Sequence, residues 1–98
     1  MQYNFPQTRF ARNNTIGAQI GHVVEEAEEV IQTLIDGEDN NRVDEELADL
    51  THSLETLWRI MARERGPEYV KQLFERVTVK NAARNYYADK NQETTPCP

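Results

Sequence analysis

The sequence predicts an all-α fold: an antiparallel helical bundle of three long helices with a short N-terminal helix, completed by oligomerisation. Apolar residues recur at helical spacing in three long stretches, and two turn signals, Asp36-Gly37 and Gly66-Pro67, separate these stretches. No segment from residue 16 to residue 88 alternates like a strand or repeats itself. Because the connections are short, we expect consecutive helices to pack as antiparallel neighbours.

The first long helix is predicted from Ile16 to Leu34, with Asn14 or Thr15 as its N-cap and Asp36-Gly37 as its end. Its side chains at spacings of three and four form one apolar stripe. The stripe consists of Ile16, Ile20, Val23, Ala27, Val30, Ile31 and Leu34.

The second helix is predicted from about Arg42 to Arg65, and the third from Pro67 to about Ala88. Both carry an apolar stripe, and we expect Trp58 to be buried in that of the second helix. The stripes consist of Val43, Leu47, Leu50, Leu54, Leu57, Trp58 and Met61 in the second helix, and of Val70, Leu73, Phe74 and Val77 in the third.

Residues 1–90 are expected to form a single domain, followed by a disordered tail over residues 91–98. A domain of this length buries only about two-thirds of its unfolded surface, so we expect a homodimer or a tetramer. The single cysteine, Cys97, has no partner for an internal disulfide. Neither a secretory signal nor an apolar run of membrane-spanning length occurs, so we expect a cytoplasmic protein with no membrane partner.

The charge is concentrated in one part of the chain. Residues 25–49 contain eleven acids and one base, a net charge of −10, whereas the rest of the chain has a net charge of +4. A nucleic-acid partner is disfavoured, because recognition of its backbone requires an extended basic surface. The acidic segment is either a solvated face or a site where metal ions lie between it and an anionic ligand.

Two pairs of acids favour the metal site. Glu26 and Glu29 share a helical face, and so do Glu46 and Asp49. Both pairs lie about ten residues from the predicted turn, so an antiparallel hairpin places them at the same height. Four carboxylates brought together repel one another without a cation, and oxygen ligands suit Mg²⁺, with Mn²⁺ as a substitute.

These residues resemble a family motif. Glu25-Glu26-Ala27-Glu28-Glu29 followed by Glu46-Leu47-Ala48-Asp49 is similar to the Glu-Glu-x-x-Glu and Glu-x-x-Asp pattern of the MazG-type all-α nucleoside triphosphate pyrophosphohydrolases. A later segment, residues 79–86 (VKNAARNY), resembles the end of the family's last helix. The likeness covers about residues 16–90.

The resemblance implies Mg²⁺-dependent conversion of a nucleoside triphosphate to its monophosphate and pyrophosphate. It assigns the metal to Glu26, Glu29, Glu46 and Asp49, and the triphosphate or sugar to Lys80, Asn81 and Arg84. It also implies a homo-oligomer, because single-domain relatives often complete the nucleotide pocket with residues of a neighbouring subunit.

Other residues add to this hypothesis. Lys80, Arg84 and Tyr87 are spaced to form a cationic stripe on the third helix that would bind phosphates, or else a solvated basic face. His22 lies four residues before Glu26 on the same helical face. It would contact that carboxylate or the nucleotide, or else it is a plain surface histidine. Glu25 and Glu45 are the candidates for a general base.

Two other functions fit the same sequence. One is a non-catalytic acidic helical module that binds a basic partner and needs no metal. The other is a dimetal carboxylate bundle, because the spacing of Asp49 and His52 resembles the Glu-x-x-His element of such bundles. Against that bundle, the first helix supplies no matching histidine, and we expect His52 to be structural or to support a ligand. The preferred base and sugar are not indicated.

Overall fold

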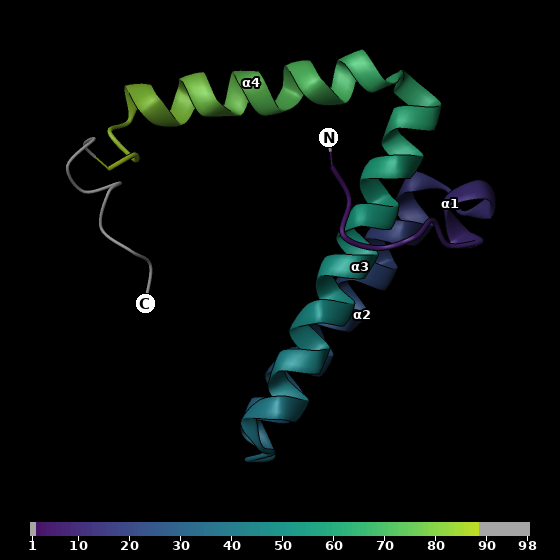
Figure 1. The fold of residues 1–98 in the computed structure, drawn as a ribbon, viewed down its shortest axis with the longest axis vertical. Coiled ribbons are helices and arrows are strands. Elements are labelled where there is room, and N and C mark those ends of the chain that lie inside the picture. The colour runs from purple at the N-terminus through teal and green to yellow at the C-terminus, as the bar shows by residue number, and fades with distance from the viewer. Residues whose placement is uncertain (1, 89–98) are drawn as a thin grey trace.

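The computed structural model describes residues 2–88, which form four α-helices and no strand (Figure 1). The helices are α1 (Phe10–Asn13), α2 (Ile16–Ile35), α3 (Asn40–Arg65) and α4 (Pro67–Ala83). The all-α prediction is therefore confirmed for this part of the chain, and none of these helices is long and apolar enough to cross a membrane. The predicted disordered tail and Cys97 lie outside the described residues.

Helices α2 and α3 form an antiparallel hairpin and pack against each other along their length (Figure 1). The Thr15 hydroxyl accepts a hydrogen bond from the Ala18 N–H at 3.1 Å and caps α2. The Asp39 carboxylate does the same for α3 through the Arg42 N–H at 3.0 Å. Gly37 has a φ of 68°, which a residue without Cβ adopts easily, so the turn ends α2 where the sequence predicts.

Helix α4 follows a different course from the one expected. Gly66, with a φ of 91°, precedes Pro67, and α4 then turns away from the hairpin rather than lying along α3 (Figure 1). Near the connection, Val70 is buried and the rings of Trp58 and Phe74 meet edge-on, with centroids 4.9 Å apart. Trp58 is nonetheless only half-buried, so the prediction that it is buried was wrong.

The hairpin is held together partly by polar contacts. Gln19 of α2 is almost fully buried, and its amide nitrogen donates to the carbonyl and hydroxyl oxygens of Ser53 in α3, at 3.0 and 3.1 Å. Its amide oxygen accepts from the Asn14 side chain at 2.9 Å. Buried polar groups with partners at every atom fix one alignment of two helices, so Gln19 sets the register of the hairpin.

The N-terminal segment crosses α3 and is fastened by three side chains one helical turn apart. The buried Glu55 carboxylate accepts hydrogen bonds from the backbone N–H groups of Asn4 and Phe5, at 2.9 and 3.0 Å, and from the Asn4 amide. Arg59 donates to the Phe5 carbonyl at 2.9 Å, and Arg63 donates to two carbonyls near α1. We call Glu55, Arg59 and Arg63 the N-terminal clamp.

The clamp makes stability depend on pH. Burial acts to raise the pKa of the Glu55 carboxyl, but the hydrogen bonds from Asn4 and Phe5, with the charge of Arg59, outweigh burial and hold this pKa below its ordinary value. The unfolded chain therefore takes up this proton first as the pH falls. The stabilisation is complete at neutral pH and is lost as the pH falls from the ordinary pKa of about 4.3 through the lower folded value.

We expect Glu55→Gln to lower the free energy of unfolding at neutral pH, because a donor group then replaces one accepting oxygen. The difference from the wild type should shrink as the pH falls below about 4. Urea unfolding of both proteins at a series of pH values measures this, with the exposed Glu75→Gln as a matched control that shows no such change. A difference that stays constant down to about pH 3 would contradict the assignment.

Candidate metal centre and its surroundings

The hairpin brings three of the four predicted carboxylates together. Glu26 from the middle of α2 meets Glu46 and Asp49 of α3, and each offers an oxygen that lies within 4.8 Å of the others. Their similar distance from the turn between the two helices therefore places these three residues at the same height, as predicted. We call them the carboxylate triad.

Glu46 is the buried member of the triad, with 3% of its surface exposed. One of its oxygens, Oε1, pairs with the Arg42 guanidinium at 2.7 Å. The other oxygen, Oε2, is buried and has no hydrogen-bond partner among residues 2–88, and the same holds for Oε2 of Glu26. Buried carboxylate oxygens normally have a partner, so two such orphaned atoms in one cluster indicate a place for a cation.

The electrostatics of Glu46 support the same conclusion. Burial raises the pKa of the Glu46 carboxyl and Arg42 acts to lower it, while the Glu29 carboxyl, close enough to share a proton with Glu46, and the charges of Glu29 and Asp49 raise it further. The net effect is a pKa above the ordinary value, because one guanidinium does not compensate for burial and two further negative charges. The positive charge of Arg42 is therefore smaller than the negative charge of the carboxylates around it.

Glu29 lies at the edge of the centre. It is exposed and is not a member of the triad, but its carboxyl is close enough to raise the pKa of Glu46. It lies about one turn of helix from Glu26, and the helical rotation between the two positions directs it more toward solvent. A hard divalent ion with six or more oxygen ligands fits this donor set of three carboxylates and a fourth at the rim.

The two histidines contact the centre in different ways. His22 Nε2 lies 3.3 Å from Glu26 Oε1, so the predicted contact with that carboxylate is confirmed. His52 stacks face to face on Phe5, with ring centroids 4.3 Å apart, and its buried Nε2 has no hydrogen-bond partner within residues 2–88. The N-terminal segment therefore helps to orient a residue beside the triad.

A small cavity of about 140 Å³ adjoins Glu26 and Asp49. Both histidines line it, together with Phe10 and several small polar residues of α2 and α3. The N-terminal part of the chain supplies Phe10 to this wall.

The two candidates for a general base lie outside the triad. Glu25 and Glu45 are exposed, and Glu45 lies 3.7 Å from the Arg42 guanidinium. Each is next in sequence to a triad member, so the helical rotation between neighbours turns it away. Their catalytic role stays a prediction.

The predicted cationic stripe of α4 is only partly helical. The helix ends at Ala83, Arg84 is its C-cap, and Asn85 has a left-handed φ of 59°. Tyr87 therefore does not continue the face of Lys80, and the prediction of one helical stripe through Tyr87 was wrong. The Arg84 guanidinium instead lies over the Tyr86 ring, 4.8 Å from its centroid.

The distal end of α4, which carries Lys80 and Asn81, points away from the hairpin (Figure 1). These residues and Arg84 are thus separated from the triad of their own chain. The phosphate-binding role of Lys80, Asn81, Arg84 and Tyr87 stays a prediction.

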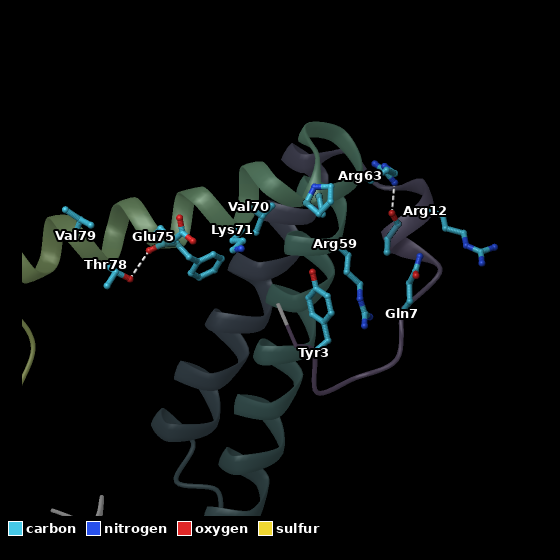
Figure 2. Close-up of a pocket in the computed structure, with 14 residues that line it drawn as sticks. Tyr3, Gln7, Arg12, Arg59, Arg63, Val70, Lys71, Glu75, Thr78 and Val79 are labelled. Carbon is cyan, nitrogen blue, oxygen red and sulfur yellow. Dashed lines mark hydrogen bonds between the residues drawn. The ribbon is translucent and has the colours of Figure 1, made fainter. Parts of the chain in front are cut away.

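A larger groove lies elsewhere. It has a volume of about 1110 Å³ and lies between the N-terminal segment, the end of α3 and α4, where Figure 2 shows Tyr3, Arg59, Val70 and Val79 around it. It contains no member of the triad, so its size does not make it the reaction site.

Two functional features were not predicted from the sequence. Arg42 was counted only as the single base of the acidic segment, although its position four residues before Glu46 is typical of a helical ion pair. The N-terminal clamp joins residues about fifty positions apart, and only the spacing of four between Glu55, Arg59 and Arg63 hinted at a shared face.

Comparisons of the chain with protein-family models, with known proteins and with solved structures found no significant match, so the likeness to the MazG-type enzymes rests on the motifs of this sequence.

Proposed function

We propose that this protein is a metal-dependent nucleotide pyrophosphohydrolase that converts an NTP or dNTP to the monophosphate and pyrophosphate. The observation that carries the proposal is the buried Glu46 carboxylate, which lies against Glu26 and Asp49 and keeps one oxygen without a partner among residues 2–88. A cation resolves this arrangement. A polyphosphate is the ligand that such a cation would bring to an otherwise acidic surface.

In this proposal Glu26, Glu46 and Asp49 hold Mg²⁺ or Mn²⁺, Glu29 completes the set from the rim, and His22 orients Glu26. The bound ion supplies Lewis acidity that lowers the pKa of a water molecule and neutralises phosphate charge. A water oxygen bonds to phosphorus, the anhydride bond between the α- and β-phosphates breaks, and the water proton passes to a base. Glu25 and Glu45 remain the candidates for that base.

The competing functions account for less of the structure. An acidic interaction module needs its charges at the surface, whereas Glu46 is buried against two other acids. A dimetal redox bundle needs histidine ligands, whereas the three side chains that come together are all carboxylates, whose oxygens suit a harder ion. A cytoplasmic location, expected from the sequence, is part of the proposal.

Metal binding can be tested without catalysis. We expect Mg²⁺ or Mn²⁺ to raise the melting temperature of the wild type, because a ligand that binds only the folded state stabilises it by about 2.7 kcal/mol at one hundred times its dissociation constant. In a domain of this size, each kcal/mol raises the melting temperature by about 4–8 °C. Thermal unfolding monitored by circular dichroism, with and without chelator, measures the shift.

Glu46→Gln should abolish the shift, because an amide is a poor substitute for a buried carboxylate ligand. The matched control is Glu28→Gln, an exposed acid on α2 outside the triad, which should keep it. Equal shifts in both variants would place the metal elsewhere, and a bound iron with an ultraviolet band after aerobic purification would favour the dimetal bundle.

Catalysis is tested by the release of pyrophosphate. Pyrophosphate release from a panel of canonical and damaged NTPs and dNTPs should require Mg²⁺ or Mn²⁺ and stop with chelator. Glu26→Gln and Asp49→Ala should lower kcat by about a hundredfold or more while the helical circular dichroism is retained, since loss of one group that stabilises transition-state charge has effects of this size. Glu29→Ala should also lose activity, and Glu28→Gln should not.

Failure of every nucleotide to release pyrophosphate would refute the enzymatic proposal. Normal activity of Glu29→Ala would remove that residue from the ligand set, and normal activity of Asp49→Ala would show that the site is misplaced.

We further propose that the protein is a homodimer or a tetramer built from dimers. Helix α2 exposes an apolar stripe on the face turned away from α3, and α4 leaves Phe74 and Val77 partly uncovered. A second copy is the occupant that fits, because Lys80 and Arg84 lie away from the triad of their own chain and a neighbouring α4 would supply them. The α2 stripe comprises Ile20, Val24, Ile31, Leu34 and Ile35.

Light scattering should give at least twice the mass of one chain. Introducing charge with the double substitution Val24→Glu and Ile31→Glu should produce a monomer with retained helicity and little activity, because both side chains are at least half exposed in one chain. Glu38→Ala in the turn between α2 and α3 serves as the control and should leave the mass unchanged. A monomeric wild type would contradict the proposal.

A further inference from the structure

The small cavity beside the triad has the features of a site for a planar ring. Its inner surface is formed by Gln19, Ser53 and Thr56, all of them buried, and its acidic end by Glu26 and Asp49. Phe10 and His22 meet edge-on at one side, with ring centroids 5.8 Å apart and planes at 86°. His52 lines the cavity and is held in place by Phe5 stacked on it.

The polar groups of this cavity are nearly all engaged. The Gln19 amide is hydrogen-bonded to Ser53 and Asn14, and the Thr56 hydroxyl donates to the His52 carbonyl at 3.1 Å. The exceptions are Glu26 Oε2, which belongs to the triad, and His52 Nε2, and both are buried with no hydrogen-bond partner among residues 2–88. Leaving such an atom unpaired is costly, so an occupant gains affinity if a small rotation of the His52 ring brings this nitrogen to the cavity surface. A ring nitrogen of histidine accepts or donates according to its tautomer, and therefore suits a base carbonyl or amino group.

The size of the cavity limits what it can hold. An apolar protein cavity of about 150 Å³ takes up one benzene ring, and this cavity has a volume of about 140 Å³. A single six-membered ring therefore fits, whereas the fused rings of a purine exceed the space. Two of the acids that would hold the metal also line the cavity, so a ring bound there would lie beside the proposed metal site.

We propose that this cavity binds the base of a pyrimidine nucleotide and that the protein selects pyrimidine over purine triphosphates. The proposal rests on the proposed pyrophosphohydrolase function for the identity of the phosphate chain, while binding of the base depends only on the cavity. His52 contributes the hydrogen bond to the base, and Phe10 lines the cavity beside His22.

Binding of products tests the site without catalysis. UMP, CMP, AMP and GMP are titrated into the full-length protein with Mg²⁺ by calorimetry, and the imidazole signals of His22 and His52 are followed by NMR. We expect the pyrimidine monophosphates to bind at least about tenfold more tightly than the purine ones and to shift the His52 signals, a ratio typical of a pocket that rejects a larger group. Equal affinities, or binding that leaves the His52 signals unchanged, would overturn the proposal.

Variants of the cavity test the origin of the selectivity. His52→Ala enlarges the cavity and removes its free hydrogen-bonding group, so the preference for pyrimidines should fall by about tenfold or more. His52→Gln keeps a hydrogen-bonding group of similar size and should retain part of the preference. Gln72→Ala, an exposed position on α4, is the control for both, and circular dichroism checks that each variant folds. A preference unchanged in His52→Ala counts against the cavity as its source.

The two proposals fail separately. If no triphosphate is hydrolysed but UMP and CMP still bind with the expected preference, the enzymatic proposal fails and the pyrimidine site stands. If purine and pyrimidine triphosphates are hydrolysed with equal kcat/KM, the enzymatic proposal stands and the pyrimidine site is refuted.

Discussion

The need to neutralise a buried carboxylate governs the arrangement of this molecule. Glu46 lies inside the hairpin because the helical face of α3 that packs on α2 includes its position. Arg42, one turn earlier, pairs with only one of its two oxygens. Glu26 and Asp49 then add negative charge where positive charge is lacking. Apolar residues of the same size would stabilise the hairpin at lower cost, so the hairpin gives up stability at the group of acids that could hold a metal ion.

The hairpin and most of the centre were predictable because they depend on local rules. Helical spacing puts Glu46 and Asp49 on one face, and the turn at Gly37 decides which residues of the two helices lie at the same height. The same rules do not show how deeply a side chain is buried. The sequence predicts both Glu29 and Glu46 as metal ligands, yet Glu29 is exposed and Glu46 is buried. Burial depends on how the two helices are rotated against each other.

Features that depend on distant contacts or on the exit angle of a helix were not predictable. The direction of α4 follows from the backbone of Gly66, for which the sequence allows several conformations. The end of α4 was placed too late because Arg84 and Tyr87 continue a helical spacing, whereas the left-handed Asn85 ends it. The clamp on Asn4 and Phe5 joins positions about fifty residues apart, which no local pattern reveals.

Helix α3 unites stability and the centre in one element. It carries Glu46 near one end, then His52, and then Glu55 of the clamp on a different face, so the residues that hold the N-terminal segment are on the same helix as two members of the triad. Phe5, held by Glu55 and Arg59, in turn stacks on His52. The clamp therefore does more than stabilise the fold, because it sets the position of a ring that lines the cavity beside the triad. A loosened N-terminal segment would disturb that cavity first and leave the three carboxylates in place, since those depend only on the packing of α2 against α3.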